Sequence, residues 1–121
     1  MKAAAICGLA MIAAFSARAA DLDAGKAVFN RCKICHTVAA GAKSTVGPNL
    51  QGVFGRKAGS LDEFRYSAAM KESGITWDET TLAGFLGDPK GYLPGNRMAF
   101  PGIADPGELE NLLAYLRDAV Q

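Results

Sequence analysis

A long stretch without helical or strand periodicity lies near the middle of the chain, across residues 37–60. Glycines at positions 41, 47, 52, 55 and 59, together with Pro48, interrupt any regular element there. Loops of this length are uncommon in small domains and are usually functional or wrapped around something. A chain of 121 residues therefore has to build its core from the few regular segments that remain.

Short helices are predicted on either side of this stretch. Residues 23–32 begin with acidic side chains and place apolar ones on a single face. Residues 66–72 are a weaker candidate, and Asp78 precedes a clearer helix over residues 79–86. Asp88 and the proline after it have the pattern of a further helix start.

The strongest helical pattern lies at the C-terminal end. Asp105, Pro106 and Glu108 have the pattern of an N-cap, a proline at the first helical position and a capping-box acid. Leucines follow at helical spacing as far as Val120, and no stretch alternates as a strand would. The predicted fold class is therefore all-α with long loops, whose thin core a large buried apolar group would complete.

The N-terminus has the pattern of an export signal. Lys2 precedes 15 uncharged residues, and a small-x-small pattern ends at Ala19. We interpret residues 1–19 as a cleaved signal peptide and residues 20–121 as one mature domain. An uncleaved membrane anchor is the alternative, but the apolar run is shorter than the ~20 residues that span a bilayer.

Removal of residues 1–19 changes the inventory of reactive side chains. The basic residues fall from 13 to 11 while the 12 acidic ones stay, so the formal charge becomes −1. With no basic run, we expect no binding to nucleic acid. The mature chain keeps these potential metal ligands and thiols: Cys32, Cys35, His36, Met70 and Met98.

The motif C-x-x-C-H is formed by Cys32, Cys35 and His36. In an exported chain this motif indicates covalent attachment of haem c, because thiols on one face of a helix end can bond the two vinyl groups of one haem. The alternatives are a disulfide, a thioredoxin-like redox pair and a zinc site. A disulfide here would close a tiny loop, a redox pair needs a βαβ setting, and zinc needs four ligands.

A haem iron bound by His36 has a sixth position to fill. The mature chain has no second histidine, which leaves Met70, Met98, a lysine or an open site. Met98 lies in the proline- and glycine-rich residues 91–102, where a methionine has less reason to pack in a core. Met98 is therefore the favoured ligand.

Several motifs in order make the chain resemble a class I cytochrome c, of the mitochondrial type and its bacterial periplasmic relatives, over residues 21–120. They are C-x-x-C-H-T-V, Gly47-Pro48-Asn49-Leu50, Gly52-Val53-Phe54-Gly55-Arg56-Lys57, Gly74-Ile75-Thr76-Trp77, Pro89-Lys90, Pro94-Gly95-Asn96-Arg97-Met98 and Tyr115-Leu116.

The resemblance implies a role for each matching site residue. His36 and Met98 match the axial ligands, Cys32 and Cys35 the thioether cysteines, and Pro48 the residue whose carbonyl accepts the His36 Nδ1–H. The side chains expected to hold the haem propionates are Arg56, Tyr66 and Trp77.

Three positions depart from the mitochondrial pattern. Phe85 stands in place of a tyrosine, Met70 in place of an asparagine, and Asn96 in place of a threonine. The usual hydrogen bonds around Met98 are therefore expected to differ in this chain.

The function implied is that of a soluble, monomeric, periplasmic one-electron carrier, not an enzyme, and without stable membrane insertion. It would work between a respiratory or photosynthetic complex or a dehydrogenase and a terminal acceptor. Redox partners are expected to dock at the haem edge through Arg31, Lys43, Lys90 and Arg97. The alternative is a haem protein with a labile Met98 that acts as a peroxidase or binds NO or CO.

The signal-peptide interpretation predicts the N-terminus of the exported protein. Mass spectrometry of the secreted protein should find that it begins at Ala20, because cleavage follows Ala19. A retained segment of residues 1–19 would show that the apolar run is an anchor instead.

Overall fold

The computed structural model describes residue 8 and residues 19–121 of the chain. Apart from residues 8 and 19, the predicted signal peptide lies outside the described residues. None of the helices in the described part of the chain combines the length and apolarity needed to span a bilayer.

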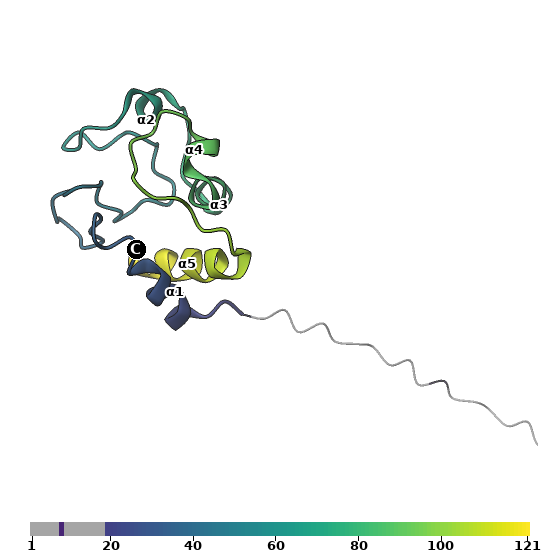
Figure 1. Cartoon of the computed structure of the whole chain (residues 1–121). Helices are drawn as coiled ribbons and strands as arrows, with labels where there is room; N and C mark the ends of the chain where they lie inside the picture. The colour runs from purple at the N-terminus through teal and green to yellow at the C-terminus, as the bar shows by residue number, and fades with distance from the viewer. Residues whose placement is uncertain (1–7, 9–18) are drawn as a thin grey trace, which may run out of the picture.

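Short helices and long irregular connections make up residues 19–121, as the fold class predicted from the sequence requires (Figure 1). Within that range the only pairing of extended segments is an isolated bridge between Lys57 and Thr76. The helices are α1 (Leu22–Phe29), α2 (Ala68–Glu72), α3 (Glu79–Gly87), α4 (Pro89–Tyr92) and α5 (Pro106–Ala119).

Aspartates cap four of these helices. Asp21 accepts a hydrogen bond from the Ala24 N–H at the start of α1, and the other three caps are the ones predicted from the sequence. The Asp78 carboxylate accepts a hydrogen bond from the Thr81 N–H at 2.8 Å, which lowers the pKa of Asp78. Asp88 accepts from the Gly91 N–H at 3.2 Å, at the start of α4. Asp105 accepts from the N–H groups of the second and third residues of α5. Local sequence therefore sets where α3, α4 and α5 begin.

Three helix predictions need correction. The helix predicted over residues 23–32 ends at Phe29, because hydrogen bonds three residues apart, such as Cys32 N to Phe29 O at 2.8 Å, replace the helical pattern. The helix predicted from residue 66 begins at Ala68, because the hydroxyl of Ser67 caps it. Glu108 does not complete a capping box, since its carboxylate lies 3.4 Å from a guanidinium nitrogen of Arg31.

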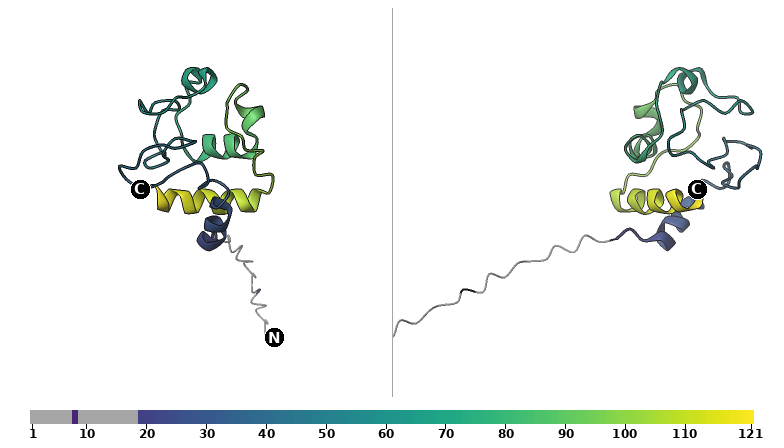
Figure 2. Two further views of the ribbon diagram at one scale, coloured as in Figure 1. Left: turned by 60° about the vertical axis from the view of Figure 1, so that its left-hand side comes forward. Right: turned by 180° about the vertical axis from the view of Figure 1, so that it is seen from behind.

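Helices α1 and α5 cross in close contact on one side of the fold, and α2, α3 and α4 lie on the other (Figures 1 and 2). The crossing requires glycine at position 25, because a Cβ there would overlap the carbonyl oxygen of Asn111 and lie 2.8 Å from Cβ of Tyr115. The ring of Phe29 packs on Tyr115 beside it, with centroids 5.4 Å apart.

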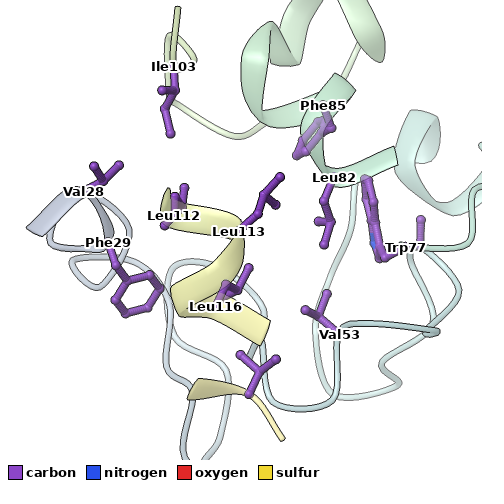
Figure 3. Close-up of a cluster of buried hydrophobic side chains, with 12 residues drawn as sticks. Val28, Phe29, Val53, Trp77, Leu82, Phe85, Ile103, Leu112, Leu113 and Leu116 are labelled. Carbon is purple, nitrogen blue, oxygen red and sulfur yellow. The ribbon is translucent and has the colours of Figure 1, made fainter. Parts of the chain in front are cut away.

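The hydrophobic core lies between these two sides of the fold (Figure 3). Val28, Leu112 and Ile103 are packed at the helix crossing, whereas Trp77 and Phe85 reach in from the α3 side, with ring centroids 5.2 Å apart. Several core side chains also border a cavity, whose lining includes exposed residues such as Arg31 and Val46.

Candidate functional site

A cavity of about 480 Å³ is lined by residues from both sides of the fold. Four of the helices contribute to its wall, through Phe29 of α1, Met70 of α2, Leu82 of α3 and Leu112 of α5. The irregular segments supply the rest. Most of the lining is apolar, so an occupant with a large apolar surface would complete the core.

The site residues predicted from the sequence all line this one cavity. They come from four separate parts of the chain, and only the tertiary fold brings them together. They are Cys32, Cys35, His36, Pro48, Arg56, Tyr66, Trp77 and Met98.

The imidazole of His36 is held by the backbone of the long irregular segment. Its Nδ1 lies 2.7 Å from the carbonyl oxygen of Pro48, so Nδ1 is the donor and Nε2 keeps its lone pair. Burial lowers the pKa of His36, which favours the neutral ring. A Cβ at Gly47 would lie 2.7 Å from Nδ1, so the backbone approaches the ring as closely as glycine permits. The side chain is fixed in the tautomer that can bind a metal.

The turn that carries the C-x-x-C-H motif is fixed by the same segment. The carbonyl oxygen of Cys35 accepts hydrogen bonds from the Gly47 N–H and the Thr45 hydroxyl, both at 2.8 Å. The Cys32 carbonyl accepts from the N–H groups of Cys35 and His36, both at 3.0 Å. The motif thus lies on tight turns after α1 and not on a helix end, which corrects the expectation from the sequence.

Both cysteines line the cavity, and no disulfide joins them. Burial raises the pKa of the Cys32 thiol. Among the described residues, no group of three or more His, Cys, Asp or Glu side chains could hold a metal ion. The described part of the chain therefore has neither the disulfide nor the zinc cluster that the motif left open.

Arg56 brings a positive charge to the cavity wall. Its guanidinium donates to the carbonyls of Asn49 and Gln51 at 3.0 and 3.1 Å, and burial lowers its pKa. Both ion pairs found in residues 19–121 involve other side chains, so Arg56 attracts the carboxylate of Glu63 without forming an ion pair. An anionic group in the cavity would give this partly buried cation a closer partner.

Tyr66 and Trp77 complete the polar part of the predicted site. The Tyr66 hydroxyl accepts a hydrogen bond from the Leu61 N–H at 3.4 Å, and burial raises the pKa of this phenol. Trp77 is buried, and its backbone N–H and carbonyl bind the segment that carries Arg56. The three residues therefore share one part of the structure.

Both methionines of residues 19–121 line the cavity, so the lining residues alone do not show which of the two would bind a metal. Met70 is in α2, whereas Met98 lies in the irregular segment that joins α4 to α5. Together with two thiols, one imidazole and an unpaired cation, a thioether completes a donor set that fits a haem with its propionates.

The cations expected to guide partners divide into two pairs. Arg31 and Arg97 line the cavity, whereas Lys43 and Lys90 do not. Arg31 also forms an ion pair with Glu108, at 3.4 Å. Arg65 also lines the cavity and was not predicted as a site residue, although it is a cation next to Tyr66 in the sequence.

Two apolar side chains are unusually exposed near the motif. Ile34 is 78% exposed and Val46, which borders the cavity, is 75% exposed. They precede Cys35 and Gly47, the two residues whose backbones are hydrogen-bonded.

Known proteins are similar to this chain in sequence and in fold. The family model described as Cytochrome c matches residues 22–119. Cytochrome c-550 of Nitrobacter winogradskyi is 48% identical over 96 residues, covering 79% of this chain and 88% of that protein. Cytochrome c2 of Blastochloris viridis is 45% identical over 112 residues, covering 91% of this chain and 88% of that protein. The solved structure of cytochrome cH from Methylobacterium extorquens is similar with a TM-score of 0.75 and 45% identity, covering 81% of this chain and 98% of that one.

The close approach of Gly47 to His36 predicts a large effect for a small substitution. Gly47→Ala should push the imidazole away and strain its hydrogen bond to Pro48, because the added Cβ has no room. We expect the free energy of unfolding of the haem-loaded protein to fall by about 1–3 kcal/mol in guanidinium denaturation. Lys43→Ala is the control in the same segment, since its side chain is exposed and lies outside the cavity lining. Equal unfolding curves for Gly47→Ala and Lys43→Ala would contradict this packing.

Proposed function

The chain belongs to the cytochrome c family, and on that premise we propose that it is a one-electron carrier of the bacterial periplasm with His36 and Met98 as the axial ligands. It is a class I c-type cytochrome with one haem c, bound covalently through Cys32 and Cys35. The bound haem supplies a one-electron iron couple. The observation that carries the proposal is the convergence of His36, Met98 and both thiols on one cavity.

The residues around the cavity have separate tasks in this proposal. Pro48 holds the His36 ring by its Nδ1–H, so that Nε2 can bind iron. The Met98 thioether favours the ferrous state and raises the reduction potential. With both axial positions taken by side chains, a substrate has no open coordination site, which suits a carrier and not an enzyme.

The polar residues of the wall have the task of holding the propionates. Arg56 is partly buried and forms no ion pair with the described residues, and Tyr66 and Trp77 line the same cavity. We assign the propionates to these three residues. Apolar lining such as Leu86 and Phe100 keeps the remaining surface of the cavity dry.

The proposed location rests on the export pattern of residues 1–19. Bacterial relatives named cytochrome c2 and cytochrome c-550 support the role of an electron carrier. In that role the protein would accept electrons from a respiratory or photosynthetic complex or from a dehydrogenase and pass them to a terminal acceptor.

Replacing each methionine in turn tests the ligand assignment. Met98→Ala should abolish the low-spin, thioether-ligated spectrum, lower the reduction potential and allow the ferrous protein to bind CO, because the sixth position opens. Met70→Ala is the matched control and should keep all three properties of the unchanged protein. The reverse pattern would make Met70 the ligand. Ready CO binding by the unchanged protein would favour a peroxidase or gas-binding function.

Partner docking at the haem edge, by a monomer, is the second part of the proposal. Arg31 and Arg97 border the cavity, and the exposed Ile34 and Val46 offer apolar contact beside the motif. Lys43 and Lys90 lie outside the lining and would act through their longer-range field. Charges of this kind orient an encounter more than they hold a complex.

Charge reversal tests the docking proposal with an anionic oxidant, hexacyanoferrate(III), as the probe. The double variant Lys90→Glu with Arg97→Glu should be oxidised about tenfold more slowly at low ionic strength, and the difference should shrink as salt is added. Lys26→Glu, an exposed charge on α1, is the control. A rate that does not depend on salt, or an equal loss in the control, would contradict docking at this edge.

A further inference from the structure

The side chain of Asn96 uses all of its hydrogen-bonding groups close to Met98. Its amide nitrogen donates to the carbonyl oxygens of Pro89 and Leu93, at 2.9 and 2.8 Å. Its amide oxygen accepts from the backbone N–H of Met98, at 3.0 Å. An asparagine amide has two N–H donors and one oxygen, so each is engaged.

These hydrogen bonds tie Met98 to a rigid part of the fold. Pro89 is the first residue of α4 and has one of the most completely buried side chains of the described residues. Its carbonyl also accepts the Leu93 N–H at 3.0 Å, which ends the helix. Because α4 packs on α3, Asn96 links the backbone of Met98 to the main body of the protein.

The segment around Met98 has little regular structure to hold it. Pro94 has no N–H to donate, and Gly95 has a φ of 90°, so a helix cannot continue through them. On the far side, the Arg97 guanidinium donates to the Arg65 carbonyl at 3.2 Å, which is an exposed contact. The partly buried Asn96 side chain is therefore the main attachment of this segment to α4.

We propose that Asn96 is the positioning residue for Met98 and that it determines how readily an outside ligand can replace this thioether. The inference rests on the proposed function, in which Met98 binds the iron. It also gives a structural reason for asparagine at position 96, where the mitochondrial pattern has a threonine. A threonine hydroxyl has a single donor and could satisfy only one of the two carbonyls, whereas asparagine satisfies both. Asn96 thus strengthens the hold on Met98.

Imidazole binding to the ferric, haem-loaded protein tests this inference, because imidazole competes for the position of Met98. The loss of the thioether-to-iron charge-transfer band reports the exchange. Asn96→Ala removes every hydrogen bond of the side chain and should bind imidazole about tenfold more tightly. Asn96→Thr keeps one donor and an acceptor, so it should lie between Asn96→Ala and the unchanged protein.

Asn111→Ala is the matched control. The Asn111 side chain also makes a tertiary hydrogen bond, to the Asp21 N–H at 2.9 Å, but it lies on α5, away from the Met98 segment. Its loss should lower the stability to guanidinium without changing the affinity for imidazole. This contrast distinguishes a local effect on the position of Met98 from a general loss of stability. If Asn96→Ala does not fold, Asn96→Thr still tests the inference.

The possible failures can be told apart. If the unchanged protein shows the thioether band and the Asn96 variants bind imidazole as weakly as it does, the positioning role is wrong and the proposed function stands. Equal gains in Asn96→Ala and Asn111→Ala would also overturn it. If the unchanged protein has no thioether band, the assignment of Met98 falls, and the role of Asn96 falls with it.

Discussion

The rest of the structure depends on a hydrophobic core that the helices do not fill by themselves. Helices α1 and α5 pack tightly enough to require glycine at position 25, and α3 packs on α5, yet side chains from all three helices also line a cavity. Buried apolar walls are stable only when something apolar fills them. The covalent haem of a c-type cytochrome is therefore a structural part of the fold as well as its redox centre.

The long loops are held by side chains that replace the hydrogen bonds of regular structure. Buried backbone groups need partners, and two asparagines supply many of them. Asn49 is 7% exposed, donates to the carbonyls of Ala39 and Ala42, and accepts from the Gln51 N–H. Asn96 has the same pattern of two donors and one acceptor in the segment of Met98. Each proposed axial ligand thus lies next to a loop fixed by an asparagine.

The cationic side chains that line the cavity fall into two groups with different tasks. Arg56 lines the cavity and forms no ion pair with the described residues, which suits the neutralisation of anionic groups there. Arg31 and Arg97 are exposed and also line the cavity, which suits brief encounters with other redox proteins. A net charge near zero leaves these local fields, and not the total, to orient a partner.

The sequence by itself determined the all-α class, the caps at Asp78, Asp88 and Asp105, and the C-x-x-C-H motif, because each depends on residues only a few positions apart. Only the tertiary structure decided that the motif lies on turns, that Glu108 meets Arg31 across 77 residues of chain, and that Met70 shares the cavity with Met98. The three hydrogen bonds of Asn96 were also beyond the reach of the sequence pattern. Such contacts form between residues that are distant in the sequence or that lie in irregular segments. These segments have no periodic pattern from which the path of the backbone could be predicted.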